Sequence, residues 1–133
     1  MFSGGKRIRP LLTLIVGEIL GVEREKILPV ACGLEVIHNF SLIHDDLPSM
    51  DNDDFRRGLP TCHKKFGVGT AILAGDALLT LGFQLITRVG NSEVVNLVAR
   101  AIGSEGMAGG QSLDVLYQDK KIRNSLKNWI RKK

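Results

Sequence analysis

The segment Val68–Arg88 constrains the fold of this 133-residue chain more than any other, because it is apolar on nearly every side. It could form about six turns of helix. A helix that is hydrophobic all round belongs in the interior of a protein. We therefore predict a buried central helix here, covered on several sides by other elements. Its apolar residues include Ala71, Ile72, Leu73, Leu78, Leu79, Leu81, Phe83 and Ile86.

Two further helices are predicted before this segment from apolar residues at helical spacing and from proline and glycine. Pro10 and Pro29 each stand where a helix can begin, because the N–H that proline lacks has no intrahelical partner in a first turn. Gly21 is expected to end the first helix. The second runs to about Asp45, and Pro48 prevents its continuation.

The rest of the chain is predicted to contain a loop and two more helices. Residues 49–67 are polar and contain Gly58 and Pro60, which favours a loop. A helix is expected at Glu93–Glu105, and a shorter one at Gln111–Leu116 after glycines that interrupt the pattern. No segment alternates as a half-buried strand does. The sequence therefore predicts an all-α fold, a helical bundle.

The net charge of +4 is concentrated at the carboxyl end of the chain. Residues 120–133 contain seven Lys and Arg and no acid, so the remainder has a net charge of +4 less 7, or −3. A nucleic-acid-binding protein needs a basic face, which the body of the chain lacks. We therefore expect no nucleic-acid partner.

The spacing of the cysteines and the lengths of the apolar runs indicate the cellular compartment and whether the chain crosses a membrane. Cys32 and Cys62 have no zinc-ligand spacing and are expected to be free thiols in a reducing environment. The apolar run Leu11–Val16 is too short to cross a membrane. The expectation is a cytoplasmic protein without a membrane span.

The acidic segment Asp45–Arg57 holds the strongest sign of chemistry. It contains five carboxylates, and Asp45 follows an apolar helix rather than a polar one. His38 lies seven residues earlier, on the same helical face. Pro48 breaks the helix, so the chain can turn and bring Asp51 back towards Asp45. A solvated loop is the ordinary interpretation of such a run, but this placement favours a site.

Converging carboxylates suit a hard cation, and Mg²⁺ commonly binds one or two carboxylates together with substrate phosphates. An EF-hand does not fit, since Phe55 stands where a ligand would be needed. The neighbouring Arg56 and Arg57 could hold phosphate oxygens in two-pronged contacts. Lys6 and Arg9 form a second cationic group near the start of the chain, although their spacing is not that of a P-loop.

Several motifs together resemble the short-chain trans-isoprenyl diphosphate synthases, the family of the farnesyl and geranylgeranyl diphosphate synthases. The motifs are GKRIRP at 5–10, DDxxxxD at 45–51, RRG at 56–58, LAGDALL at 73–79 and GQSLD at 110–114. The resemblance covers residues 4 to about 122. It identifies 1–122 as a partial polyprenyl synthetase domain and leaves 123–133 as a divergent basic tail. The fold that it implies is a truncated helical bundle of the isoprenoid synthase type.

The resemblance also implies a reaction, the Mg²⁺-dependent condensation of an allylic prenyl diphosphate with isopentenyl diphosphate. Asp45 and Asp51 would hold Mg²⁺ on the allylic diphosphate with Asp46 in support, and Arg56 would contact the same diphosphate. The choice between farnesyl and geranylgeranyl products stays open. The residues implied to bind isopentenyl diphosphate are Lys6, Arg9, His38 and Arg57, and Gln111 is expected to face the same cavity.

Besides its divergent tail, the chain departs from the family pattern because the second aspartate-rich motif and the later lysines are absent. We therefore expect this chain to be inactive alone. A truncated bundle would expose an apolar face of Val68–Arg88, which favours a homodimer or association with a full-length synthase. Two alternatives remain: a non-catalytic partner subunit, and a helical phosphohydrolase suggested by His44-Asp45. The second leaves Arg56 and Arg57 unexplained, and the chain has only three histidines.

Overall fold

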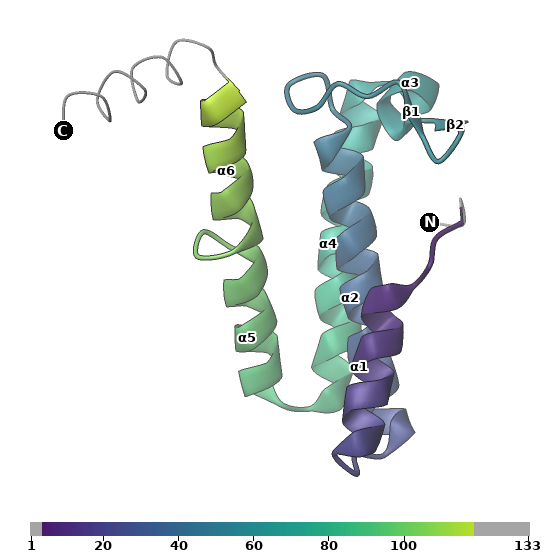
Figure 1. Cartoon of the computed structure of the whole chain (residues 1–133), viewed down its shortest axis with the longest axis vertical. Helices are drawn as coiled ribbons and strands as arrows, with labels where there is room; N and C mark the ends of the chain where they lie inside the picture. The colour runs from purple at the N-terminus through teal and green to yellow at the C-terminus, as the bar shows by residue number, and fades with distance from the viewer. Residues whose placement is uncertain (1–3, 119–133) are drawn as a thin grey trace, which may run out of the picture. The chain divides into compact units, whose positions relative to one another are not determined.

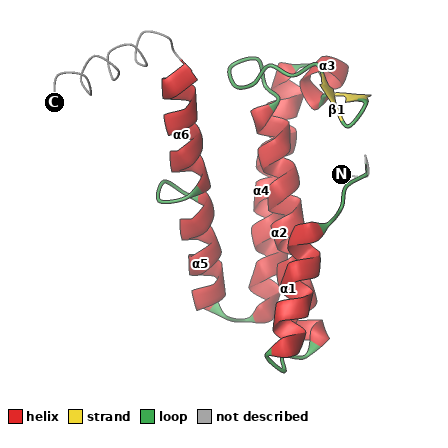
Figure 2. Ribbon diagram, in the orientation of Figure 1, coloured by secondary structure: helices red, strands yellow, loops and turns green. Residues whose placement is uncertain are grey.

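The computed structural model describes residues 4–118. The chain divides into two compact units, Met1–Ser92 and Glu93–Lys133. The first unit contains helices α1 (Ile8–Ile19), α2 (Arg24–Asp45) and α4 (Val68–Ile86), and α2 runs antiparallel to both α1 and α4 (Figure 1). The all-α fold class is confirmed, since helices make up nearly all of the regular structure (Figure 2).

Helices α1 and α2 begin earlier than their prolines predicted. Helix α1 starts at Ile8, so Pro10 lies in its first turn, and it ends before Gly21, whose φ of +73° suits glycine. Helix α2 begins at Arg24, and the prediction of a start at Pro29 is wrong. The hydrogen bond that Pro29 forgoes lies near the exposed start of the helix, where burial of Ile27 holds the additional turn in place.

Helix α2 occupies the centre of the first unit, because it packs against both α1 and α4. At its crossing with α4 two glycines face each other. A Cβ on Gly33 would lie 2.8 Å from the Gly82 carbonyl oxygen, and one on Gly82 would lie 2.5 Å from Ile37 Cγ1. Small residues therefore let the two backbones approach closely. The buried apolar residues of this unit are Ile27, Ala31, Val36, Ile37, Leu47, Ala71 and Ile86.

The predicted helix at Val68–Arg88 is present; it is not buried on all sides, so the prediction of a buried central helix is wrong, whereas the apolar face expected to be exposed in a truncated bundle is observed. Only Ala71, Gly75, Gly82 and Ile86 of α4 are buried. The side chains of Ile72 and Leu73 are exposed. Helix α4 has helical neighbours along the face that meets α2 and α3, and its other apolar residues reach the surface. A short 3-10 helix, η1 (Thr87–Val89), follows it.

The predicted loop at 49–67 contains short elements that alternation could not predict. Strands β1 (Phe55–Arg56) and β2 (Leu59–Pro60) form an antiparallel hairpin of two residues each, and helix α3 (Cys62–Phe66) follows. The two-residue turn Arg57-Gly58 has positive φ at both positions, +54° and +77°, which suits the twist of a tight hairpin. The Thr61 hydroxyl donates to the Asp53 carbonyl oxygen at 2.8 Å and fastens the hairpin to α3.

The second unit contains α5 (Ser92–Ile102) and α6 (Met107–Gln118). Helix α5 ends three residues before the predicted Glu105. Helix α6 begins at Met107 and runs through Gly109 and Gly110, so the prediction of a helix only at Gln111–Leu116 is wrong. Glycine allows close backbone approach at Gly106 and Gly109, where a Cβ would clash with the Ala101 and Ser104 carbonyl oxygens, whereas a Cβ on Gly110 would meet nothing within 4 Å. The predicted tail at 123–133 lies outside the described residues.

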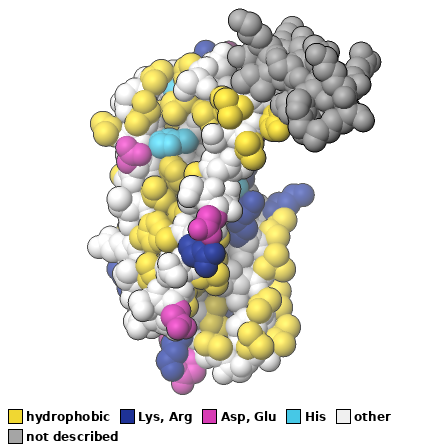
Figure 3. Space-filling model, turned by 90° about the vertical axis from the view of Figure 1, so that its left-hand side faces the viewer, with side chains coloured by type: hydrophobic (Ala, Val, Ile, Leu, Met, Phe, Trp, Pro, Cys, Tyr) yellow, Lys and Arg dark blue, Asp and Glu magenta, His cyan; other side chains and the backbone are white. Residues whose placement is uncertain are grey.

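Much of the apolar surface is exposed. No residue of α1 is buried, and the side chains of Ile19 and Leu20 are 77% and 73% exposed. Figure 3 shows apolar side chains reaching the surface over much of the face that it presents. Two segments, Arg24–Asp45 and Val68–Val89, are long and apolar enough to cross a membrane on length and composition alone, a property that core helices of soluble proteins share.

Candidate functional site

Three segments that are far apart in the sequence meet at one concavity of about 470 Å³ in the first unit. They are the chain leading into α1, the middle of α2 and the turn of the hairpin. We call this concavity the cationic pocket. Four of the predicted binding residues, Lys6, Arg9, His38 and Arg57, line it, and the other lining residues are Gly5, Arg7, Ile8 and Glu35.

Two of the pocket's arginines have an unusual backbone conformation. Arg7, which precedes the first residue of α1, has a φ of +50°, and Arg57 has a φ of +54°. A left-handed conformation costs a residue other than glycine about 1–2 kcal/mol. The Arg57 guanidinium donates a hydrogen bond to the Gly4 carbonyl oxygen, which ties the hairpin to the start of the chain. Such strain persists where surrounding contacts impose it, and it is often found at functional sites.

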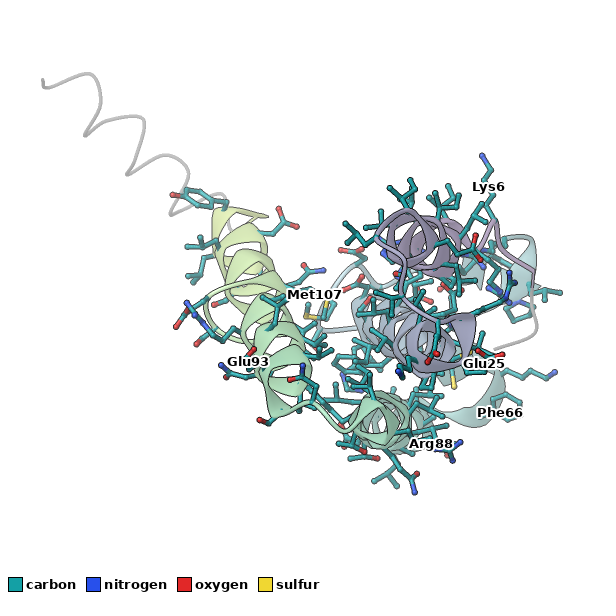
Figure 4. All side chains as sticks on the ribbon, turned by 90° about the horizontal axis from the view of Figure 1, so that it is seen from below. Lys6, Glu25, Phe66, Arg88, Glu93 and Met107 are labelled. Atoms are coloured by element: carbon teal, nitrogen blue, oxygen red, sulfur yellow. The ribbon has the colours of Figure 1, made fainter. Side chains whose placement is uncertain are left out.

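Arg9 and His38 contact each other across the pocket, with Arg9 Nη1 3.3 Å from His38 Nε2. Burial and then the charge of Arg9 lower the pKa of His38. The imidazole is therefore neutral at about pH 7. Because a guanidinium can only donate, Nε2 accepts this hydrogen bond and the ring proton lies on Nδ1. The Nδ1–H group is then a donor. Figure 4 shows the Lys6 side chain extending outward from the start of α1.

Sequence reasoning missed Glu35 as a member of this site. Its Oε1 accepts a hydrogen bond from Arg7 Nη1 at 2.7 Å, and the two residues form an ion pair across 28 positions of sequence. The Glu35 side chain is only 13% exposed. A signal was available, since Glu35 precedes His38 by three residues and both therefore lie on one face of a helix.

Asp46 was expected to support the metal site, and in the structure it forms an ion pair with Arg56. Its carboxylate is nearly fully buried, and Arg56 holds it with Nε at 2.8 and 2.9 Å from the two oxygens and Nη2 at 2.6 Å from Oδ1. This hydrogen bond is the main reason that the pKa of Arg56 is raised. The structure therefore places Asp46 against Arg56 at the carboxyl end of α2.

Asp45 and Asp51 come together as the break at Pro48 predicts. The Asp51 N–H donates to the Asp45 carbonyl oxygen at 2.9 Å, which closes the turn after α2. Burial and then the charge of Asp51 raise the pKa of Asp45. The negative charge of Asp51 disfavours ionisation of Asp45, and a bound cation would offset this repulsion.

This pair fits Mg²⁺, which needs only one or two protein carboxylates when phosphates complete its coordination. No group of three or more His, Cys, Asp or Glu side chains in residues 4–118 is arranged to hold a metal ion by itself. The remaining predicted residue, Gln111, lies in α6 of the second unit, half-buried and three residues before Asp114 on that helix.

Fold and site together define an all-helical protein whose cationic pocket and nearby paired carboxylates suit a phosphate-bearing ligand. The family model described as polyprenyl synthetase matches residues 1–133. The chain belongs to the polyprenyl synthetase family.

Relatives and solved structures agree with this assignment. The chain is 51% identical to a farnesyl diphosphate synthase of Geobacillus stearothermophilus, over 96% of this chain and 46% of that protein. It is 48% identical to a heterodimeric geranylgeranyl pyrophosphate synthase large subunit from Arabidopsis thaliana, over 86% of this chain and 33% of that protein. A geranyltranstransferase structure from Thermotoga maritima matches with a TM-score of 0.85 at 48% identity, over 90% of this chain and 44% of that one. The chain spans about half the length or less of these proteins.

Proposed function

We propose that the protein to which this sequence belongs condenses an allylic prenyl diphosphate with isopentenyl diphosphate. In this reaction the allylic C–O bond breaks and its electron pair leaves with the diphosphate. The double bond of isopentenyl diphosphate then forms a bond to the allylic carbon, and a proton is lost from the product. Family membership and relatives named as farnesyl and geranylgeranyl diphosphate synthases support this proposal.

The observation that carries the proposal is the convergence of Lys6, Arg9, His38 and Arg57 on one pocket. These residues come from three separate segments, and Arg9 contacts His38 within the pocket. We assign this pocket to the diphosphate of isopentenyl diphosphate, because guanidinium groups form strong, charge-assisted bonds to phosphate. A neutral His38 contributes a hydrogen-bond donor there without adding charge.

The carboxylates at the end of α2 are assigned to the allylic diphosphate. Asp45 and Asp51 would hold Mg²⁺, which neutralises the negative charge that the departing diphosphate gains. Asp46 supports this site by fixing the guanidinium of Arg56 beside it, at distances of 2.6–2.9 Å. Arg56 keeps an Nη1 group outside those contacts with Asp46, and we assign this group to the same diphosphate. Gln111, in the second unit, stays a predicted substrate-binding residue.

We also propose that the chain acts in an assembly, as a homodimer or in association with a longer synthase. Extensive exposed apolar surface on α1 and α4 supports this. A second candidate function is that of a non-catalytic partner subunit, favoured by the relative whose name describes a heterodimeric synthase. The two differ in outcome: a partner subunit would change the turnover of a complete synthase that is added to it, without turnover of its own.

Isothermal titration calorimetry with inorganic diphosphate tests the metal assignment. We expect weak binding that depends on Mg²⁺ and that is lost in the variant with Asp45→Ala and Asp51→Ala. The matched control carries Glu18→Ala and Glu23→Ala, because both residues are exposed and the change in net charge is the same. Equal binding by the Asp45/Asp51 variant and the control would refute the assignment.

A further inference from the structure

Of the described residues that line the cationic pocket, Glu35 alone is an acid. A carboxylate in a pocket for an anion would be expected to oppose binding. We propose that Glu35 is a positioning residue, which acts through Arg7 to hold the segment before α1 in the conformation that binds isopentenyl diphosphate. The inference rests on the proposed function, and it adds a residue that does not itself contact the substrate.

The contact between Glu35 and Arg7 is well suited to fix one segment on another. The 2.7 Å hydrogen bond joins the segment before α1 to the middle of α2. Glu35 has little freedom there, because the next residue, Val36, is buried and Asn39 Nδ2 donates to the Glu35 carbonyl oxygen at 2.7 Å. A carboxylate that is 13% exposed requires a partner for its charge. Glu35 is therefore a rigid anchor for Arg7.

The segment before α1 depends on such an anchor. It begins with Gly4 and Gly5, which have many accessible backbone conformations. It is attached at two points, Gly4 to the Arg57 guanidinium and Arg7 to Glu35. Lys6 lies between these two attachments. Loss of the second attachment would free Lys6 and remove a contact that holds Arg7 in its left-handed conformation.

Two opposing effects would follow from Glu35→Gln. Removing one negative charge favours an anion, by about fivefold for a pair 4 Å apart in water and by more at a side chain that is only 13% exposed. Releasing the segment means that the ligand must order it again, and fixing the backbone of a single residue already corresponds to about fivefold to thirtyfold in an equilibrium constant. Two residues, Gly5 and Lys6, lie between the attachments, so the ordering effect is larger. We expect the variant to bind about fivefold more weakly or worse, the opposite of what charge alone predicts.

The experiment is calorimetric titration of the whole chain with isopentenyl diphosphate, for wild type, Glu35→Gln and a control. Glu18→Gln is the matched control, because Glu18 pairs with Arg24 at 3.0 Å on the exposed surface. The expected result is weaker binding by Glu35→Gln and unchanged binding by Glu18→Gln. Glu35→Asp should recover part of the affinity. In a background with Arg7→Ala, Glu35→Gln should weaken binding no further.

Limited trypsin digestion without ligand gives a second readout that does not depend on affinity. Cleavage after Lys6 and Arg7 should be faster in Glu35→Gln than in Glu18→Gln, at an unchanged thermal midpoint. Equal or tighter binding by Glu35→Gln would overturn the inference and leave the proposed function intact. Equal cleavage rates would also overturn it. Absence of binding by the wild-type chain would refute the proposed isopentenyl diphosphate site, and the inference with it.

Discussion

Gly82 lies where α4 crosses α2, and its replacement by alanine tests the packing that holds the first unit together. A Cβ at this position would lie 2.5 Å from Ile37 Cγ1 and 3.1 Å from the Gly33 carbonyl oxygen. Ile37 is 3% exposed, so its side chain has no free space into which to rotate. The carbonyl oxygen belongs to the backbone of α2, and it can move only if the helix moves.

Two terms set the size of the effect. Overpacking a closely packed site costs about 1–3 kcal/mol. The change from glycine to alanine in a helix interior returns up to about 1 kcal/mol through helix propensity. Gly69 provides the control, because it lies in the first turn of the same helix and a Cβ there meets nothing within 4 Å. We expect Gly82→Ala to be less stable than Gly69→Ala by about 2 kcal/mol.

Urea unfolding followed by circular dichroism measures this difference. At a slope of about 1–3 kcal/mol per molar urea, it corresponds to midpoints roughly 1 M apart. The slope should be equal in the two variants, since both unfold the same surface. If the Gly82→Ala variant is at least as stable as the Gly69→Ala variant, α2 and α4 do not approach as closely as described.

Three further predictions concern the site and the surface. Asp46→Asn should lower the free energy of unfolding by about 2 kcal/mol in urea titrations, because the partly buried Arg56 loses its closest charged partner and keeps only the longer contact with Asp53 at 3.8 Å. The raised pKa of Asp45 means that its ionisation opposes folding, so its contribution is favourable below the unfolded pKa and is lost as the pH rises through the folded pKa. Asp45→Asn should therefore have a higher thermal midpoint than wild type at about pH 7, and an equal one at about pH 3; a constant difference between these pH values would contradict the assignment. Ile19→Lys, at a side chain 77% exposed, should reduce self-association in sedimentation velocity and change stability by less than about 0.5 kcal/mol.

Much of the candidate site followed from the sequence because its chemistry depends on local spacing. His38 and Asp45 share a face of one helix, and the break at Pro48 brings Asp51 back to Asp45, as predicted. The motif residues of the first unit that were assigned to isopentenyl diphosphate meet in one pocket. The first of these relations is local to α2 and the turn that follows it. The second was predicted from the motifs by which the chain resembles the family.

Other features could not be predicted, because they depend on contacts between distant segments. The pairing of Glu35 with Arg7 crosses 28 positions, and no local pattern selects that arginine over its neighbours. Asp46, rather than another carboxylate of the acidic segment, pairs closely with Arg56 because the hairpin folds back on the end of α2. The hairpin strands are two residues long, too short for alternation to appear.

The sequence by itself determined that this chain is helical, where its five longer helices lie to within five residues at either end, and which side chains carry charge towards a phosphate. Apolar periodicity, proline and glycine act within one or two turns, so these properties are local. The tertiary structure decided that α2 rather than α4 is the central helix, that α2 extends past Pro29 to Arg24, and that Glu35 belongs to the pocket. These outcomes depend on which surfaces are buried against each other, and the free energy of this burial is gained only when distant parts of the chain come into contact.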